Sequence, residues 1–302
     1  MQKYAIIDLG TNSVKFFLAE IKEGKINTII DTNEISRLGE GLQKAGIISP
    51  EAFTRNIEVL KKFKQIALKH QVDKIHAVGT MCLRTAKNAA DFIKAAESQT
   101  GIDIKVLNGE QEARLSYLAV VGDFLDGEEN IAVFDTGGGS TEFIFGKGEK
   151  LKDRLSLDIG AVRLTEEYLK SDPVSHAELK NMLGYIIDFF KRYDLNRKVE
   201  RLVGIGGTLT SMGAVKHKMK DYDPQVIQGS ELTLAQIDQM IAQFAEKTVN
   251  ARKEIVGLQP KRADVILAGA AIVRSVLSIF HLDRLTISDR GLRHGLLLDL
   301  IR

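Results

Sequence analysis

A chain of 302 residues is long for one hydrophobic core, so its length favours two domains of ordinary size. With 44% hydrophobic and 27% charged residues, its composition is typical of a soluble globular protein, and no apolar run is long enough to span a bilayer. The net charge of +2 excludes the strong overall field that attracts a nucleic acid polymer. The single Cys82 cannot form an internal disulfide, and the N-terminal residues lack a secretory signal, so we expect a cytoplasmic protein without membrane partners.

The chain begins with two apolar segments joined by a short polar turn. The first segment ends at Asp8 and the second continues through Phe17, which predicts a β-hairpin. The turn holds small and polar residues: Gly10, Thr11, Asn12 and Ser13. Strand and helix patterns then alternate, with strands expected at 25–33, 74–79 and 104–107 and helices at 51–70, 88–98 and 110–121.

The opening pattern returns 127 residues later, around Asp135. An apolar segment at 131–134 leads into this Asp, and the turn that follows contains Gly137, Gly138, Gly139, Ser140 and Thr141. Because Asp, Gly, Ser and the following Phe coincide in the two segments, we infer that one domain was duplicated. In this half we expect strands at 142–146, 153–156 and 201–203 and helices at 177–192, 234–246 and 263–280.

Strands that alternate with helical crossovers indicate an α/β fold with a mixed sheet flanked by helices in each half. We expect domain I at 1–124 and domain II at 125–290, with the boundary in the polar stretch 123–130 and a helix at about 291–302 that packs back on domain I. Ligands of such sheets bind beyond the strand ends, so we expect the site in an interdomain cleft.

Three glycine-containing loops offer groups that bind phosphate, because glycine brings backbone N–H groups close and Ser or Thr hydroxyls add donors. Two are the hairpin turns, and the third, Gly206-Gly207-Thr208, follows a short strand and opens a helix. A lone loop of this kind is more often a tight turn, but three in one chain favour phosphate binding. None has the Gly-Lys-Ser/Thr of a Walker A loop.

Asp8 and Asp135 each end an apolar strand, where a carboxylate must be hydrogen-bonded, cap a turn or hold a metal through water. Capping is the usual role of a single Asp at such a position. Beside a phosphate loop we favour Mg²⁺, because this hard cation takes one or two carboxylates and keeps several waters.

With these loops in place, the chain resembles the exopolyphosphatase/guanosine pentaphosphate phosphatase family of the actin-like ATPase superfamily. The resemblance covers nearly the whole chain and implies two duplicated actin-like (ribonuclease H-like) domains. It rests on the segments 7–13, 80–84, 109–114, 135–142, 206–208 and 291–295. The segment Gly109-Glu110-Gln111-Glu112-Ala113-Arg114, followed by the Asp135 loop at this distance, is the most specific of them.

The resemblance implies in-line attack by water on a terminal phosphoanhydride, with Glu112 as general base, Glu110 as the alternative and Arg84 on the phosphate oxygens. It implies Mg²⁺, with Mn²⁺ as the alternative ion, held mainly by Asp135 with help from Asp8 and Glu142. The phosphate cradle consists of the three loops, 10–13, 137–141 and 206–208. We expect Asp135 to face Glu112 across the cleft, and the Asp8 loop to be the supporting phosphate clamp.

Three residues depart from the family pattern: Gln111 stands where Glu is usual, Cys82 where a small Ala is usual, and His294 where an acidic residue is usual. Gln111 lowers the local negative charge, Cys82 is expected to be a packed small residue, and the role of His294 stays open. The other five histidines show no metal-ligand spacing.

The function we expect is that of an exopolyphosphatase that removes terminal phosphates from inorganic polyphosphate. Guanosine pentaphosphate 5′-phosphohydrolase is the close alternative, and an actin-like ATP-dependent small-molecule kinase and a non-catalytic nucleotide-binding regulator are the more distant ones. The match around Glu112 argues against the kinase, and the retained Glu112, Asp135 and Arg84 argue against lost activity. A homodimer is the oligomeric state that the family suggests.

Overall fold

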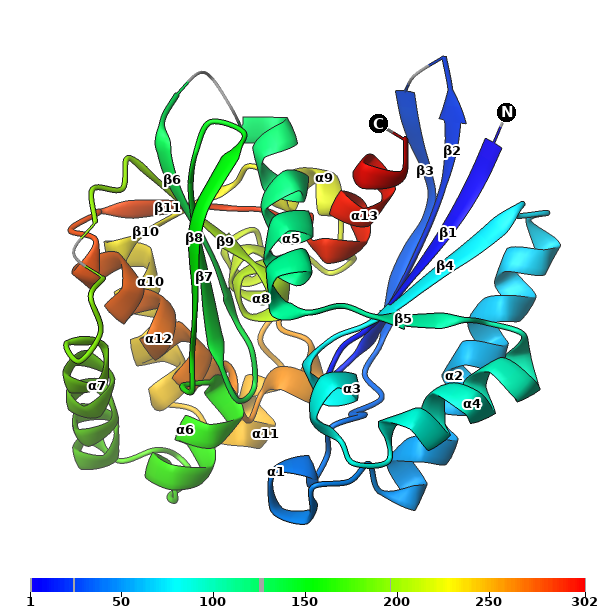
Figure 1. Ribbon diagram of the computed structural model, residues 1–302. Coiled ribbons are helices and arrows are strands. Elements are labelled where there is room, and N and C mark those ends of the chain that lie inside the picture. The colour runs from blue at the N-terminus through cyan, green and yellow to red at the C-terminus, as the bar shows by residue number, and fades with distance from the viewer. Residues whose placement is uncertain (1, 24, 125–127, 196, 302) are drawn as a thin grey trace. The chain divides into compact units, whose positions relative to one another are not determined.

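The computed structural model describes residues 2–23, 25–124, 128–195 and 197–301 (Figure 1). The chain divides into two compact units, unit 1 with residues 1–119 and 292–302 and unit 2 with residues 120–291. The division falls within helix α5 (Gly109–Phe124), a few residues before the boundary expected in the stretch 123–130. Within that stretch, residues 125–127 lie outside the described part of the chain. No helix among the described residues is both long and apolar enough to cross a membrane.

Unit 1 is built on a five-stranded mixed sheet with the order β3-β2-β1-β4-β5. Its three N-terminal strands pair antiparallel, and β4 and β5 pair parallel to β1 and β4. The strands are β1 (Gln2–Leu9), β2 (Val14–Lys22), β3 (Lys25–Glu34), β4 (Lys74–Gly79) and β5 (Ile104–Val106). The first hairpin expected from the sequence is therefore β1–β2.

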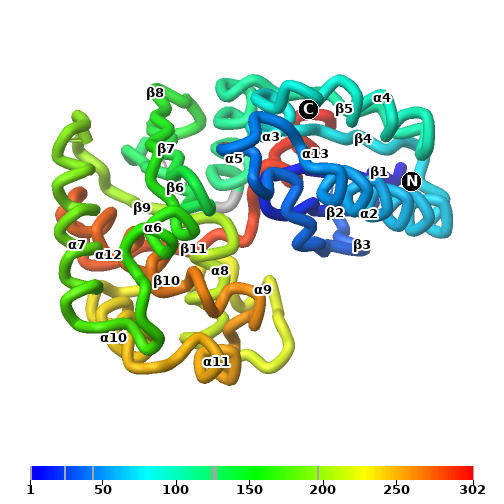
Figure 2. Tube along the Cα trace, turned by 90° about the horizontal axis from the view of Figure 1, so that it is seen from below, coloured from blue at the N-terminus to red at the C-terminus, as the bar shows by residue number. Residues whose placement is uncertain are grey.

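Two long helices, α2 (Pro50–Lys69) and α4 (Ala89–Thr100), run side by side on one face of this sheet (Figures 1 and 2). The Ser49 hydroxyl caps α2 by accepting from the Ala52 N–H. Phe16 on β2 stacks on Phe63 of α2 with ring centroids 4.9 Å apart, and both rings are fully buried. Unit 1 also contains two short helices, α1 (Leu42–Ala45) and α3 (Met81–Thr85).

The C-terminal helix α13 (Leu292–Ile301) packs on β1 and β2, where Leu297 joins a cluster with Ile6 and Phe17. On its polar side Arg293 donates to both Asp31 oxygens at 2.7 and 3.0 Å, and His294 Nε2 lies 3.0 Å from Asp31 Oδ2. The sequence left the role of His294 open. In the structure it joins Arg293 in binding α13 to β3.

Unit 2 is built on a six-stranded mixed sheet with the order β10-β11-β9-β6-β7-β8. Strands β6, β7 and β8 pair antiparallel, β9 and β11 continue the sheet in parallel, and β10 closes it antiparallel to β11. The strands are β6 (Asn130–Thr136), β7 (Thr141–Lys147), β8 (Lys150–Leu157), β9 (Arg201–Ile205), β10 (Glu231–Thr233) and β11 (Arg284–Ile287).

Helix α12 (Ile266–Ile279) is almost entirely buried and packs against α6, α7 and α10 (Figure 2). Capping boxes start α7 at Ser175 and α10 at Thr233. In each, the backbone N–H of the third helical residue donates to the capping hydroxyl, and the side chain of that residue accepts from the backbone N–H of the capping residue. The remaining helices of unit 2 are α6 (Ala161–Tyr168), α7 (His176–Phe190), α8 (Gly206–Lys216), α9 (Pro224–Ile227), α10 (Leu234–Ala245), α11 (Val249–Arg252) and the 3₁₀ turn η1 (Pro260–Arg262).

The two units repeat one strand arrangement, since β3-β2-β1-β4-β5 has the same order and the same strand directions as β8-β7-β6-β9-β11. Even the irregularities coincide. The register shifts between Leu18 and Ala19 in one unit and between Phe145 and Gly146 in the other, again 127 residues apart. A shared bulge at the same register supports the duplication inferred from the sequence.

The helices and strands expected from the sequence are present, with ends that coincide or differ by at most three residues. The sequence did not predict several short elements, among them α3, α6, β10 and β11. These elements have three to eight residues, which is too few for a hydrophobic period to stand out.

We predict that Asp31→Asn destabilises the protein at neutral pH by about 3 kcal/mol, because it removes a carboxylate that pairs with Arg293 and His294 in a mostly buried cluster. Burial alone would raise the pKa of Asp31, but hydrogen bonds from His294 and Arg293 and the charge of Arg293 bring it below the usual value. A carboxyl with a lowered pKa stabilises the fold above its unfolded pKa of about 4, and this contribution is lost as the pH falls through the folded value. Denaturant unfolding of both proteins across this range should give a difference that shrinks in acid; a constant difference would contradict the prediction.

We also predict that Gly295→Ala destabilises unit 1 by about 1–3 kcal/mol. A Cβ at Gly295 would lie 1.8 Å from the backbone oxygen of Leu115, so α13 could no longer approach α5 as closely. The matched control is Gly184→Ala in α7, where nothing lies within 4 Å of the new methyl group and alanine favours the helix. Thermal unfolding should show a lower Tm for the first variant only.

Candidate active site

In unit 1, Asp8 lies at the end of β1 and pairs in register with Lys15 on β2. The Lys15 ammonium donates to Asp8 Oδ2 at 3.2 Å, and the Asp8 side chain is only 4% exposed. The turn between the strands is closed by a hydrogen bond from the Gly10 N–H to the Ser13 oxygen at 3.0 Å. The first glycine-containing loop is thus a tight hairpin turn that begins two residues after the buried Asp8.

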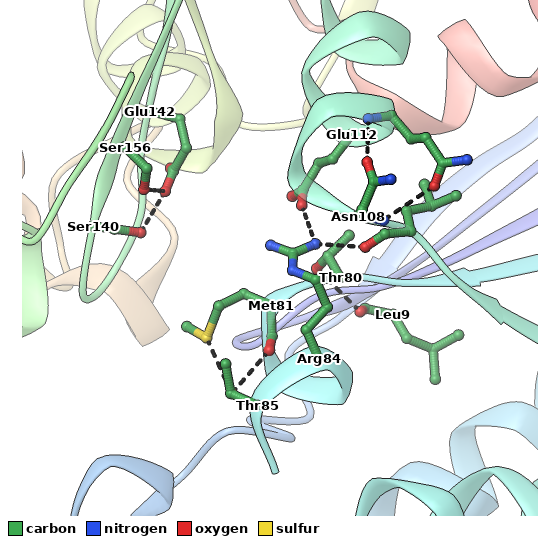
Figure 3. Close-up of polar contacts among 12 residues, drawn as sticks. Leu9, Thr80, Met81, Arg84, Thr85, Asn108, Glu112, Ser140, Glu142 and Ser156 are labelled. Carbon is green, nitrogen blue, oxygen red and sulfur yellow. Dashed lines mark hydrogen bonds and ion pairs between the residues drawn. The ribbon is translucent and has the colours of Figure 1, made fainter. Parts of the chain in front are cut away.

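Strand β4 lies beside β1 and ends next to Thr80, which begins the short helix α3. This helix carries Arg84, whose guanidinium donates to Glu112 Oε2 at 2.6 Å and to the Leu107 carbonyl oxygen at 2.8 Å (Figure 3). The sequence therefore predicted two residues that the structure brings into direct contact.

Glu112 lies in the first turn of α5, where the helix dipole favours a negative charge. The helix start is fixed by a reciprocal pair: the Asn108 side chain accepts from the Gln111 N–H, and the Gln111 side chain accepts from the Asn108 N–H. Gln111 thus serves the helix start. Glu110, the alternative base, has an exposed side chain.

Burial raises the pKa of Glu112 above its usual value, and the charge of Asp8 adds to this effect. The hydrogen bond and charge of Arg84 act in the opposite direction, as does the charge of Lys15. Two carboxylates and two cations therefore interact at this end of the unit 1 sheet. A carboxylate whose pKa is raised in this way is a stronger base than an exposed glutamate.

In unit 2, Asp135 lies one residue before the end of β6 and pairs in register with Glu142 on β7. The triple-glycine turn between them is closed by a hydrogen bond from the Gly137 N–H to the Ser140 oxygen at 2.9 Å. The carbonyls of Gly137 and Gly138 accept N–H groups from the start of α6, which fixes the peptide planes of the loop.

The Glu142 carboxylate accepts two hydroxyl donors, Ser140 at 2.6 Å and Ser156 at 3.1 Å (Figure 3). Hydroxyl donors orient a carboxylate without neutralising its charge. The two hydroxyl groups thus orient the Glu142 carboxylate.

The third loop connects β9 to α8 and approaches Asp135 closely. Gly206 has a φ of 84°, and a Cβ there would lie 2.1 Å from Asp135 Oδ1. Only glycine gives the Asp135 carboxylate this space. Thr208, in the first turn of α8, donates its hydroxyl to the Thr136 oxygen at 3.1 Å and so ties this loop to β6.

Two basic residues of these sites were not singled out in the sequence. Lys15 lies inside the first hairpin motif, but only the strand register shows that it faces Asp8. Arg262 ends the turn η1, and its guanidinium lies against the backbone of Gly207, within 2.6 Å of the place where a Cβ would be. Burial lowers the pKa of Arg262 and the charge of Asp135 raises it, so the two groups interact.

The chemistry of unit 2 fits a hard divalent cation. Asp135 and Glu142 supply carboxylate oxygens on paired residues, and the glycine at 206 leaves room at Asp135. No group of three His, Cys, Asp or Glu residues among the described residues forms a closed metal site. Such a cation would therefore keep several waters or phosphate oxygens, as Mg²⁺ does.

Cys82 is fully buried, and burial raises its pKa to about 11. It packs in the core of unit 1 as a small apolar residue, and a thiol with this pKa is a poor nucleophile.

Comparison with known proteins identifies the family. A profile of the Ppx/GppA phosphatase family matches residues 17–302. Exopolyphosphatase 2 of Mycobacterium tuberculosis is 30% identical over 99% of both chains. The bifunctional 3-dehydroquinate synthase/phosphatase of Fusobacterium nucleatum is 33% identical over 98% of this chain, which spans 46% of that longer protein.

Solved structures agree with the sequence relatives. The PPX-GPPA enzyme of Aquifex aeolicus is 37% identical with a TM-score of 0.86, and the alignment covers 99% of each chain. An exopolyphosphatase from Cytophaga hutchinsonii is 25% identical with a TM-score of 0.89, over 99% of this chain and 98% of that one. These neighbours confirm the expected fold of two actin-like α/β domains. The chain belongs to the Ppx/GppA phosphatase family, whose members are hydrolases of phosphoanhydrides, as its motifs predicted.

Proposed function

We propose that this protein is an exopolyphosphatase that hydrolyses the terminal phosphoanhydride of inorganic polyphosphate with a divalent cation, Mg²⁺ before Mn²⁺. The observation that carries the proposal is the ion pair of Arg84 with Glu112, a half-buried carboxylate with a raised pKa at the start of α5. Relatives named exopolyphosphatase match this chain over nearly its whole length, which supports the choice of substrate.

In this proposal Glu112 takes a proton from the attacking water. The water oxygen forms a bond to the terminal phosphorus while the bridging P–O bond breaks, and the products are orthophosphate and a polyphosphate shortened by one unit. The raised pKa of Glu112 suits it to this proton transfer. Arg84 both orients Glu112 and supplies a cation to the phosphate oxygens.

Asp135 and Glu142 would hold the cation, whose chemistry is to neutralise charge on the phosphate oxygens. The protein adds neutral donors of its own: the backbone N–H groups of the loops at 10–13, 137–141 and 206–208. Lys15 and Arg262 add positive charge at the first and third loops.

The direct test is phosphate release in parallel from long polyphosphate, short polyphosphate, guanosine pentaphosphate and ATP, with Mg²⁺ and without a phosphate acceptor. We expect release from polyphosphate to be fastest. Preferential release from guanosine pentaphosphate would indicate a guanosine pentaphosphate 5′-phosphohydrolase instead. Release only from ATP, and only with an acceptor, would contradict hydrolysis.

We predict that Glu112→Gln keeps the fold but lowers kcat by about 10²–10⁴-fold, the usual contribution of a positioned general base. The matched control is Glu110→Gln, the same change at an exposed position of the same helix turn, which should keep near-normal turnover. Steady-state phosphate release and circular dichroism check both variants. If Glu110→Gln were the inactive variant, the base would be Glu110.

We predict that Arg84→Gln moves the acidic limb of the pH profile of kcat/KM to higher pH. This shift is separate from any loss of rate that the substitution also causes. Arg84 lowers the pKa of Glu112 against the effect of burial, so its removal should raise the pH at which the base becomes protonated. The measurement is the pH dependence of phosphate release by both proteins. A limb that stays in place would show that Glu112 is not the group that titrates.

A further inference from the structure

A small apolar cluster in unit 1 joins the segments that carry its site residues. The buried members of this cluster are Val78, Leu107, Leu115 and Leu292. Val78 lies on β4 and pairs in register with Asp8 at the end of β1. The Leu107 carbonyl accepts the hydrogen bond of the Arg84 guanidinium at 2.8 Å. The cluster therefore lies against two of the segments that form the site.

Leu115 connects the cluster to the general base of the proposed mechanism. It follows Glu112 by three residues on α5, a spacing that places two side chains on one face of a helix. Glu112 in turn accepts from the Arg84 guanidinium at 2.6 Å (Figure 3). The position of α5 on the cluster thus sets the position of the Glu112 carboxylate.

The fourth member of the cluster, Leu292, begins the C-terminal helix α13 and is 6% exposed. The chain enters α13 from unit 2, so contacts with the rest of unit 1 keep this helix in place. In one of them the backbones of α13 and α5 approach closely, since a Cβ at Gly295 would lie 1.8 Å from the Leu115 oxygen. Another is the ion pair of Arg114 with Asp299 at 2.8 Å.

The apolar contact contributes more to this arrangement than the ion pair. The Arg114 side chain is 53% exposed and that of Asp299 37% exposed, and ion pairs exposed to this degree contribute little to stability. A buried leucine side chain contributes much more. Replacing Leu292 by alanine would leave a cavity in the cluster, into which the surrounding structure relaxes in part. A shift of α5 toward this space would move Glu112 relative to Arg84.

We propose that Leu292 is a positioning residue for the reaction: it holds the start of α5 on the cluster, so that Glu112 stays in contact with Arg84. Leu292 acts through Leu115 and not on the substrate itself. This inference rests on the proposed function, in which Glu112 is the general base. It makes the last helix of the chain part of the structure that prepares the attacking water.

The test is Leu292→Ala in the full-length protein, with phosphate release from polyphosphate measured across pH. We expect kcat to fall at least about 10-fold with KM nearly unchanged, because a displaced base slows the reaction of bound substrate. We also expect the acidic limb of kcat/KM to move to lower pH. Burial is the main cause that raises the pKa of Glu112, so a looser α5 lets this pKa fall. The direction is opposite to that expected for Arg84→Gln.

The matched control is Leu297→Ala, the same change in the same helix at a fully buried leucine that packs with Ile6 and Phe17. It should lower the Tm but leave kcat and the acidic limb as in the wild type. Leu292→Met keeps most of the side-chain volume and should restore both. If Leu292→Ala fails to fold, Leu292→Val takes its place, with smaller shifts in the same directions.

Two results would overturn the inference. One is a folded Leu292 variant with the kcat and the acidic limb of the wild type. The other is the same change of kcat and limb in Leu297→Ala, which would show that α13 acts through stability alone.

A titration by nuclear magnetic resonance separates this inference from the proposed function, because it requires no turnover. With the glutamate carboxyl carbons labelled with carbon-13, the signal of Glu112 is the one that is missing from Glu112→Gln. We expect Leu292→Ala to lower the pKa of Glu112 and Leu297→Ala to leave it in place. An inactive wild type with this pattern supports the positioning and contradicts the function. An active wild type in which both variants leave the titration unchanged contradicts only the role of Leu292.

Discussion

The tight turn that closes each N-terminal hairpin is the constraint on which both halves of the site depend. One N–H···O bond, from Gly10 to Ser13 and from Gly137 to Ser140, fixes the register of the two strands. That register places each strand-end Asp opposite one residue of the partner strand, Lys15 in unit 1 and Glu142 in unit 2. A slip by one residue would turn every side chain to the other face, so the turn sets the chemistry as well as the fold.

The second requirement is a helix start beside the first turn. The Asn108–Gln111 pair begins α5 at the point where its first-turn carboxylate meets Arg84. Burial and Arg84 then act on Glu112 in opposite directions, and burial prevails, so the carboxylate is both held in place and basic. The duplicated scaffold thus gives unequal halves: Asp8 faces Lys15 in unit 1, and Asp135 faces Glu142 in unit 2.

The sequence was sufficient wherever the signal was local. Both hairpins and the start of α5 follow from contiguous motifs, whereas the contact of Arg84 with Glu112, 28 residues away, was not predicted. It was insufficient where function depends on register or on distant partners. Lys15 faces Asp8 only because β1 and β2 pair as they do. Arg262 reaches Gly207 from another part of the chain, and His294 meets Asp31 across a separation of 263 residues. Short elements such as β11, with four residues, are too short to show a hydrophobic periodicity.

The central claim is that water, and no other acceptor, attacks the terminal phosphorus of polyphosphate. The most direct measurement is hydrolysis in water enriched in oxygen-18, followed by mass spectrometry of the released phosphate and of the shortened chain. If water attacks the terminal phosphorus, each orthophosphate carries one solvent oxygen and the shortened chain carries none. Label in the shortened chain, or orthophosphate without label, would contradict the account.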